Sequence, residues 1–262
     1  MNVDDIKQIS VIGSGLMGHG IALQFALGGY EVSINDVSEQ NLDRATENIR
    51  DTLEMLVHMD IVNKSALNEV PNKISNNTSL SKTVENADFV IEAVFEDLAL
   101  KQSIFAKLDE LAPKHTILSS NTSSFMSSQL ASSTNRRDKV VVANWWNPPY
   151  LLPLIEIVKG PDTSNHTIDT TANLFTKLGK KPVVLQKESL GFIGNRMQFA
   201  LLREAISIVE NGIATTEDVD IVVKNSFGRR LSVAGPFEAF DLAGWDTITA
   251  IIEQLFPDLD TK

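Results

Sequence analysis

A glycine-rich turn between an expected strand and an expected helix constrains the fold of this chain more than any other feature. The sequence Gly13-Ser14-Gly15-Leu16-Met17-Gly18 directly follows the apolar segment 8–12 and opens an apolar stretch that reaches about Gly28. The first glycine of such a turn permits the sharp bend, the second lets the backbone approach a pyrophosphate, and the third allows the helix to pack closely on the strand. Since the helix start then faces the anion, the motif predicts a dinucleotide site.

One acidic residue indicates which dinucleotide is bound. Asp36 follows the expected strand 31–35, where its carboxylate can accept hydrogen bonds from an adenosine ribose diol. The same charge repels a 2′-phosphate, and no Arg or Lys lies between Asp36 and Arg44 to receive one. We therefore expect NAD rather than NADP. A second role for Asp36, as the cap of a helix that begins near 37–39, is compatible with this expectation.

Strand and helix patterns alternate as far as about residue 187. Short β-branched runs predict strands at 8–12, 31–35, 89–94, 117–119, 140–143, 154–158 and 182–185. Their alternation with amphipathic stretches is typical of βαβ units and a parallel sheet. After Glu188, apolar residues recur at helical spacing over 192–210, 216–224 and 247–256. The predicted fold class is α/β: a Rossmann-type doubly wound sheet over residues 1–187, followed by a smaller all-helical C-terminal domain over residues 188–262.

Composition narrows the range of partners. A formal net charge of −11 disfavours binding to nucleic acid, because such proteins need clustered Lys and Arg. No apolar run approaches the ~18 residues of a bilayer-spanning helix, and the acidic start at 1–5 does not resemble a signal peptide. Without cysteine there is no disulfide or cysteine zinc site, and no metal is expected. We expect a cytoplasmic protein without a membrane partner. We also expect a homodimer formed through the C-terminal helices, because a domain of so few residues does not bury a core by itself.

Three segments carry polar residues where a core strand or helix would not place them. Glu156 interrupts the apolar strand 154–158, and a buried carboxylate is costly unless it is paired or hydrogen-bonded. The segment 121–124 follows a strand with consecutive amide and hydroxyl groups, where open α/β sheets bind ligands, although an ordinary polar turn has the same composition. Asn195 lies at the start of a mostly apolar helix, as a cap or as a functional residue.

Five segments, in order along the chain, resemble the 3-hydroxyacyl-CoA dehydrogenase family. They are the glycine motif continued as Gly18-His19-Gly20-Ile21-Ala22, then Asp88-Phe89-Val90-Ile91-Glu92-Ala93, Ser120-Asn121-Thr122-Ser123-Ser124, Asn147-Pro148-Pro149 and Gly191-Phe192-Ile193-Gly194-Asn195-Arg196. The resemblance covers essentially the whole chain, and it implies an NAD-dependent oxidoreductase of fatty acid metabolism with a small-molecule substrate. In the family the chain usually continues into further helices, whereas this sequence stops at Lys262.

The resemblance also implies roles for individual residues. Ser123 and Asn195 are expected to hydrogen-bond the hydroxyl or carbonyl group of the substrate, and Glu156 to orient a catalytic histidine. The position that matches this histidine is Asn144. The expected cofactor contacts are Gly13, Ser14, Gly15, Leu16, Met17, Gly18, Asp36, Glu96, Lys101, Ser123 and Asn147.

Asn144 changes the expected chemistry, because an amide cannot accept the hydroxyl proton as imidazole does near neutral pH. Losing a general base typically slows a reaction ~10²–10⁴-fold. We expect Asn144 to donate a hydrogen bond to Glu156, so that folding and NAD binding survive. An engineered substitution is the favoured explanation, beside a natural enzyme with another base and a homologue that binds without reacting. The other histidines are expected at the surface, at His19, His58, His115 and His166.

Substrate identity stays open between two classes. Residues 147–154, 228–230 and 235–238 resemble the branch of the family that contains λ-crystallin and L-gulonate 3-dehydrogenase, which adds a short hydroxy acid to the acyl-CoA thioester as a candidate substrate. Arg229 or Arg230 would receive a free carboxylate or a CoA phosphate, unless both are simply solvated. The rival to an enzyme is a catalytically silent NAD-binding protein with a structural or sensing role. A decarboxylating hydroxyacid dehydrogenase is disfavoured, since no lysine follows Gly191 in that helix.

Overall fold

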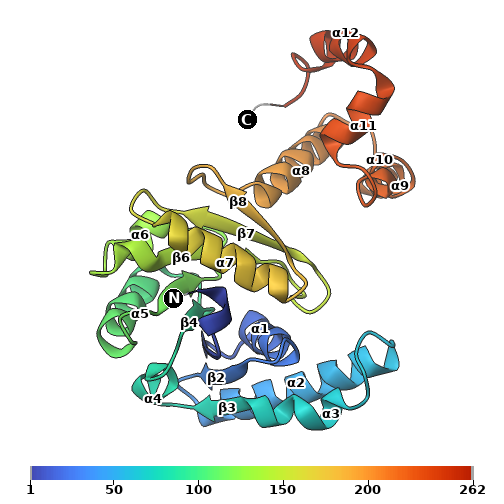
Figure 1. Cartoon of the computed structure of the whole chain (residues 1–262). Coiled ribbons are helices and arrows are strands. Elements are labelled where there is room, and N and C mark those ends of the chain that lie inside the picture. The colour runs from blue at the N-terminus through green and yellow to red at the C-terminus, as the bar shows by residue number, and fades with distance from the viewer. Residues whose placement is uncertain (1, 261–262) are drawn as a thin grey trace. The chain divides into compact units, whose positions relative to one another are not determined.

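The structure is a computed structural model that describes residues 2–260 (Figure 1). Met1, Thr261 and Lys262, which the predicted domains include, lie outside the described residues. The chain forms two compact units, one ending at Ile193 and the other beginning at Gly194. The boundary predicted between residues 187 and 188 falls in the run of bends and turns that closes the first unit.

The first unit is built on an eight-stranded sheet with the order β3-β2-β1-β4-β5-β6-β7-β8. The strands are β1 Gln8–Ile12, β2 Glu31–Asn35, β3 Ile74–Asn77, β4 Phe89–Glu92, β5 Ile117–Ser120, β6 Val140–Trp145, β7 Leu154–Lys159 and β8 Lys181–Leu185. The strand order turns back at β1, which pairs with both β2 and β4. This order confirms the predicted doubly wound sheet, and β3 is a strand that the sequence analysis missed.

Helices cover both faces of the sheet. They are α1 Leu16–Leu27, α2 Glu39–His58, α3 Ala66–Glu69, α4 Leu80–Val84, α5 Leu98–Leu111, α6 Ser127–Ala131 and α7 Asn165–Lys177. Neighbouring residues of β1 point to opposite faces, as the pleat requires: Val11 joins a core with Phe25 of α1 and Phe175 of α7, and Ile12 joins a core with Phe105 of α5. The two buried cores explain why the strands read as nearly continuous apolar runs.

One strand pair departs from the predicted parallel sheet. β7 runs antiparallel to β6, whereas β7 and β8 are again parallel. The reason is the connection: the short loop 146–153 joins β6 to β7, and a parallel pair needs a longer crossover, usually a helix. The antiparallel register sets Asn144 directly opposite Glu156.

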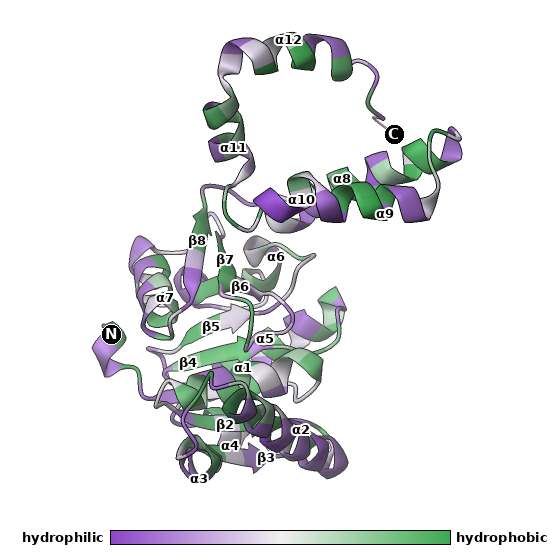
Figure 2. Ribbon diagram, turned by 90° about the vertical axis from the view of Figure 1, so that its right-hand side faces the viewer, coloured by the Kyte–Doolittle hydropathy of each residue, from purple (hydrophilic) through white to green (hydrophobic). Residues whose placement is uncertain are grey.

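The second unit consists of helices, as predicted. They are α8 Gly194–Glu210, α9 Thr216–Asn225, α10 Phe227–Arg230, α11 Pro236–Ala243 and α12 Trp245–Leu255. Figure 2 shows apolar residues along α8, α9 and α12, yet within these five helices Ile248 alone is buried. Leu242, Val233 and Phe237 are each more than three-quarters exposed. Taken by itself, this unit leaves most of its apolar surface uncovered.

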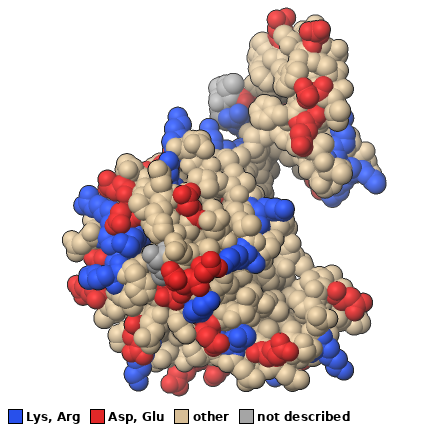
Figure 3. All heavy atoms as spheres, viewed as in Figure 1, with Lys and Arg blue, Asp and Glu red and all other residues tan. Residues whose placement is uncertain are grey.

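The charged side chains of the first unit are interspersed. On the face seen in Figure 3, Lys and Arg lie among Asp and Glu, so this face carries both signs although the net charge of the chain is −11. Over residues 2–260, no helix combines the length and the apolar character that crossing a membrane requires.

Candidate functional site

A cavity of about 1040 Å³ opens in the first unit at the carboxyl ends of the strands. Five connections after strands contribute to its wall: residues 13–17 after β1, 36–37 after β2, Thr78 after β3, 93–96 after β4, and Asn121 with Ser123 after β5. Because the strand order turns back at β1, the cavity lies at the topological switch point, where open α/β sheets bind ligands.

The three glycines of the first turn have three different environments. Gly13 has a φ of +99°, and a Cβ there would lie 2.7 Å from the carbonyl oxygen of Ala93. A Cβ on Gly18 would lie 1.8 Å from the carbonyl oxygen of Gly13, so this glycine is needed for packing and does not line the cavity. A Cβ on Gly15 would meet nothing within 4 Å. The space beside Gly15 and the unpaired N–H groups of the first helical turn fit a pyrophosphate.

Asp36 is held in place by four donors. Its Oδ2 accepts from the backbone N–H and the hydroxyl of Ser14 at 3.1 and 2.8 Å, and its Oδ1 accepts from Ser38 N at 3.3 Å and Asn41 Nδ2 at 2.9 Å. Partial burial acts to raise the pKa of Asp36, but these donors together hold it below its usual range. The N-cap of α2 is Ser38, whose hydroxyl accepts from Asn41 N. Asp36 is therefore not the N-cap residue itself, but it accepts a hydrogen bond from the backbone N–H of that residue.

Several residues of this cavity were not identified from the sequence. Asn41, Arg44 and Asn48 line it from one face of α2, and Lys107 lines it from α5. Their helical spacing was visible in the sequence, but nothing local indicated that this face would border a cavity rather than solvent.

His19 was expected at the surface, and this prediction was wrong. The imidazole is only 6% exposed, lines the cavity, and has its Nδ1 2.8 Å from the carbonyl oxygen of Gly15. Its position directly after Gly18 was the available signal, since that part of α1 packs against the sheet.

Asn144 and Glu156 form a buried pair across β6 and β7. The Nδ2 of Asn144 donates to Oε2 of Glu156 at 3.0 Å, and the side chains are 5% and 1% exposed. The same oxygen accepts from Trp146 Nε1 at 3.3 Å, and Oε1 accepts from the backbone N–H of Ile193 at 2.8 Å. The carboxylate therefore has the partners that its burial requires, and the hydrogen bond expected from Asn144 is present.

The buried pair lies next to the wall of the cavity. Asn121 lines the cavity, and its Oδ1 accepts a 2.8 Å hydrogen bond from the backbone N–H of Trp145, the residue after Asn144. Ser123, two residues beyond Asn121, also lines the cavity. The structure thus brings Ser123, Asn144 and Glu156 into one region of the first unit.

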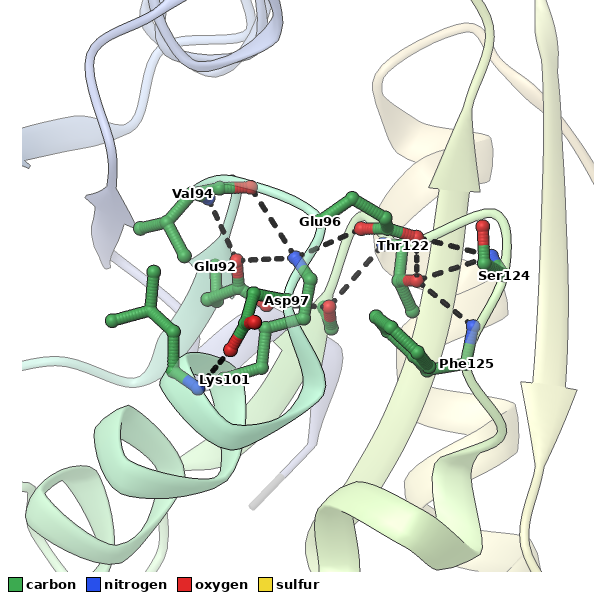
Figure 4. A network of polar contacts seen from close by, with 10 residues as sticks. Glu92, Val94, Glu96, Asp97, Lys101, Thr122, Ser124 and Phe125 are labelled. Atoms are coloured by element: carbon green, nitrogen blue, oxygen red, sulfur yellow. Dashed lines mark hydrogen bonds and ion pairs between the residues drawn. The ribbon is translucent and has the colours of Figure 1, made fainter.

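Glu96 and Lys101 occupy different places. Glu96 lines the cavity, and its Oε1 accepts from the Thr122 hydroxyl and from Ser124 N (Figure 4). Burial acts to raise the pKa of Glu96, but the Thr122 hydroxyl, the Lys101 ammonium and Ser124 together lower it. Lys101 is 1% exposed and is not among the lining residues.

Two further predicted residues are not among those that line the cavity. Asn147 is exposed in the loop between β6 and β7 and precedes a cis proline, Pro148. Asn195 is the second residue of α8, in the second unit, and therefore lies inside the helix rather than at its cap.

Two family models match nearly the whole chain. The model described as 3-hydroxyacyl-CoA dehydrogenase, NAD binding domain, matches residues 8–189, and the model described as 3-hydroxyacyl-CoA dehydrogenase, C-terminal domain, matches residues 191–262. The lambda-crystallin homolog of Homo sapiens is 38% identical over 89% of this chain and 74% of its own length. The mitochondrial hydroxyacyl-coenzyme A dehydrogenase of Sus scrofa is 37% identical over 95% of this chain and 79% of its own length.

Solved structures extend the similarity to a third kind of substrate. The structure of 5-formyl-3-hydroxy-2-methylpyridine 4-carboxylic acid 5-dehydrogenase, described as an NAD⁺-dependent dismutase, superposes with a TM-score of 0.91 at 32% identity, over 98% of this chain and 82% of that one. The (S)-3-hydroxybutyryl-CoA dehydrogenase of Ralstonia eutropha superposes with a TM-score of 0.82 at 29% identity, over 97% and 88% of the two chains.

Proposed function

We propose that this chain, which belongs to the 3-hydroxyacyl-CoA dehydrogenase family, oxidises the 3-hydroxyl group of a 3-hydroxyacyl-CoA or a related short 3-hydroxy acid. The chain is an NAD-dependent oxidoreductase with NAD as its cofactor. NAD, when bound, supplies the hydride acceptor. The protein has to seat the cofactor, orient the substrate hydroxyl group and remove its proton.

The seat of the cofactor is supported by the cavity. In our proposal the pyrophosphate lies at the open backbone of Gly15 and the start of α1, and Asp36 accepts hydrogen bonds from the adenosine ribose. All four donors of Asp36 come from protein groups, so its carboxylate is oriented before a ribose arrives. Glu96 and Ser123 also line the cavity, and we assign the nicotinamide half of the cofactor to them.

The observation that carries the proposed reaction is the pair formed by Asn144 and Glu156. A buried carboxylate bonded to residue 144 is suited to orient an imidazole there and to stabilise it when it takes up a proton. With an amide at this position the hydrogen bond to Glu156 remains, and the proton acceptor is lost. We therefore propose that the chain as written binds both ligands and turns over slowly.

Restoring the base tests this function. We expect Asn144→His to raise the rate of NADH oxidation or formation, measured by absorbance, about 10²–10⁴-fold over the unchanged chain. The substrates to test are acetoacetyl-CoA and L-gulonate. Asn144→Gln is the matched control, because its amide accepts no proton either, and it should stay slow.

The rival is an NAD-binding protein without turnover, and the amide of Asn144 is the observation that favours it. Both proposals expect NADH to bind to the unchanged chain. If Asn144→His binds NADH and still oxidises or reduces none of these substrates, the enzyme proposal is wrong and the rival is retained.

The substrate class rests on two kinds of relative. Hydroxyacyl-CoA dehydrogenases favour a thioester and a place in fatty acid metabolism, whereas the lambda-crystallin homolog favours a short acid. Arg229 and Arg230, at the end of α10, are exposed and form no ion pair within residues 2–260, so either is available to a phosphate or a carboxylate. The cytoplasmic location stays a prediction from the sequence, and the relatives include mitochondrial enzymes.

We also propose that a second copy of the chain covers the second unit. The support is the apolar surface of its helices, where Phe199, Phe237 and Leu242 are 61%, 78% and 86% exposed. So large an uncovered surface is unusual for a monomer, and a two-fold axis lets one apolar face cover itself. Sedimentation equilibrium at micromolar concentration should give the mass of two chains. A monomer at every concentration contradicts the dimer, and Phe237→Glu should shift the equilibrium toward one chain.

A further inference from the structure

His19 lies one turn of α1 beyond Gly15, and its side chain is bonded back to that glycine. The carbonyl oxygen of Gly15 accepts from the backbone N–H of His19 at 3.2 Å and lies 2.8 Å from His19 Nδ1. Because a carbonyl oxygen only accepts, Nδ1 carries a proton in this contact. The other ring nitrogen, Nε2, is therefore the atom that gains or loses a proton when the ring titrates.

The Nε2 atom of His19 is open to the cavity. Over residues 2–260 it has no hydrogen-bond partner, although the side chain is only 6% exposed. Nε2 is not among the fully enclosed polar atoms without a partner, which within these residues are Ser119 Oγ and Trp145 Nε1. Since His19 lines the cavity, its remaining exposure is toward that space. One ring carbon separates Nε2 from Nδ1, so this open nitrogen lies beside the backbone of Gly15.

The other charged groups that line the cavity keep their charge near neutral pH. Burial acts to raise the pKa of Asp36 and of Glu96, but the hydrogen-bond donors of both, and an ammonium group beside Glu96, outweigh it. Arg44 of α2 and Lys107 of α5 are cations. Among the described residues that line the cavity, His19 is thus the side chain whose charge changes near neutral pH.

The chain around His19 supplies no other charge. Residues 8–30, which include β1, the glycine turn and α1, contain no Asp, Glu, Lys or Arg. A Cβ on Gly20, the next residue of α1, would lie 2.6 Å from Pro149 Cγ and 3.4 Å from Tyr150 Cδ1, and a tyrosine phenol is uncharged near neutral pH. From these residues, an anion at the glycine turn therefore meets the N–H groups of the helix start and the imidazole of His19.

We propose that His19 contacts the pyrophosphate of the cofactor through Nε2 and takes up a proton from solvent when the cofactor binds. The proposal rests on the proposed function, which seats the pyrophosphate beside Gly15. A protonated Nε2 donates a charge-assisted hydrogen bond to a phosphate oxygen, whereas a neutral ring with its proton on Nδ1 turns a lone pair toward that oxygen. Binding therefore selects the protonated ring, and the affinity for the cofactor rises as the pH falls through neutrality.

The first test measures the Kd for NADH by fluorescence from pH 8.5 to pH 6. In the unchanged chain the Kd should fall about tenfold over this range, because a hydrogen bond to a charged group changes a dissociation constant by about that factor. ADP-ribose, which keeps the pyrophosphate and lacks the nicotinamide, should show the same change. Calorimetry of ADP-ribose binding at pH 7, in two buffers with different heats of ionisation, should show a net uptake of protons.

Two variants of His19 assign the effect to its ring. His19→Asn keeps a short amide for the carbonyl group of Gly15 and removes Nε2, whereas His19→Gln keeps a longer amide that carries no charge. Both should bind NADH with a Kd that does not vary with pH, and His19→Asn should bind it about tenfold more weakly than the unchanged chain at pH 6. His58→Gln is the matched control, since it changes an exposed histidine of α2 outside the cavity and should keep the full pH dependence.

Four results would overturn the proposal. They are a Kd of the unchanged chain that is constant with pH, a pH dependence that persists in both His19 variants, an affinity that falls in acid, and a change for NADH that is absent for ADP-ribose. An affinity that falls in acid means that Nε2 accepts from a hydroxyl group, and a change seen with NADH alone assigns His19 to the nicotinamide half. The measurements on the unchanged chain need no variant to fold.

Failure of this proposal and failure of the proposed function give different results. If the unchanged chain binds NADH equally well at every pH, His19 does not pair with the pyrophosphate and the proposed function stands. If the unchanged chain binds no NADH at any pH, the proposed function and the role of His19 are both wrong.

Discussion

Asn144 and Glu156 face each other across β6 and β7, and the amide of Asn144 donates to Oε2 of Glu156 over 3.0 Å. The register of an antiparallel pair sets these two residues opposite each other, whatever the chemistry of residue 144. The loss of a proton acceptor at this position therefore need not disturb the sheet. Because two other donors, Trp146 Nε1 and Ile193 N, also reach the carboxylate, Glu156 holds three segments of the first unit together.

Glu156→Ala is expected to destabilise the first unit. The substitution leaves the Asn144 amide, the Trp146 indole N–H and the Ile193 N–H without their acceptor, and each unsatisfied buried donor costs about 1–3 kcal/mol. Urea unfolding should show a loss of roughly 3 kcal/mol or more. The control is Glu110→Ala on the exposed face of α5, which should stay within about 0.5 kcal/mol of the unchanged chain. A loss for Glu156→Ala as small as that of the control would contradict this prediction.

Two glycines of the first turn should respond differently to the same added methyl group. Gly15 has an ordinary φ of −66° and open space around its Cβ position, so Gly15→Ala should fold with unchanged stability and bind NADH roughly tenfold more weakly or worse. Gly18→Ala should unfold the turn, because its Cβ would overlap the carbonyl oxygen of Gly13. Thermal unfolding and NADH titration of both variants check this. If Gly15→Ala binds NADH as tightly as the unchanged chain, the proposed position of the pyrophosphate beside Gly15 is wrong.

The donors around Asp36 predict a pH dependence of stability. Burial acts to raise the pKa of Asp36, but hydrogen bonds from the Asn41 amide, the Ser14 hydroxyl and the backbone N–H groups of Ser14 and Ser38 outweigh it and hold the pKa below its ordinary value of 3.8. A lowered folded-state pKa gives stability that is present above 3.8 and is lost as the pH falls through the lower, folded value. The difference in unfolding free energy between the unchanged chain and Asp36→Asn should therefore be constant from pH 7 to about 5 and shrink below 3.8. A difference that already declines near pH 6 would contradict the shift.

Strands whose sequence carries their own apolar pattern were predictable. The bounds of β1 and β2 agree with the expectation residue for residue, because both strands are β-branched and lie next to clear turns. β3 was missed, since Ile-Ser-Asn-Asn has one apolar residue and becomes a strand only by pairing with β2 at the edge of the sheet. α11 was missed too, because its 8 residues are too few to show a long periodic apolar pattern. Local sequence patterns thus predicted the central strands of the sheet and did not predict the elements that form only through contacts with neighbouring segments.

The site divides in the same way. The glycine turn and Asp36 were identifiable because both lie within one βαβ unit, where sequence distance fixes spatial distance. The cost of burying a carboxylate predicted that Glu156 has a partner, and the resemblance to the family pointed to residue 144 as that partner. The sequence did not indicate that Arg44 would line the cavity, or that Lys101 would be buried and not among the residues that line it. Both depend on how α2 and α5 pack against the sheet.

Lys180 supplies a last prediction, on the loop that joins the two strands of the site. This lysine is 7% exposed, and its Nζ donates to the carbonyl oxygens of Pro149 and Leu152 and lies 5.4 Å from the ring centre of Trp145. Burial lowers the pKa of Lys180 from 10.5 to about 8. Lys180→Met should loosen the loop 146–153, because both carbonyl groups lose their donor, and so reduce the free energy of unfolding.

The sign of the pH effect distinguishes this lysine from a surface one. Between pH 8 and 10.5 the unfolded chain keeps the Lys180 proton and the folded chain has released it, so folding becomes more favourable as the pH rises through this window. Below pH 8 both states are protonated, and the contribution of Lys180 no longer varies. Urea unfolding of the unchanged chain and of Lys180→Met, compared at each pH, cancels the titration of all other lysines. The difference in unfolding free energy between the two chains should be constant below pH 8 and grow in favour of the unchanged chain above it. A difference that stays constant at every pH would contradict the lowered pKa. It would mean that the buried Lys180 remains charged, stabilised by the two carbonyl groups and the face of Trp145.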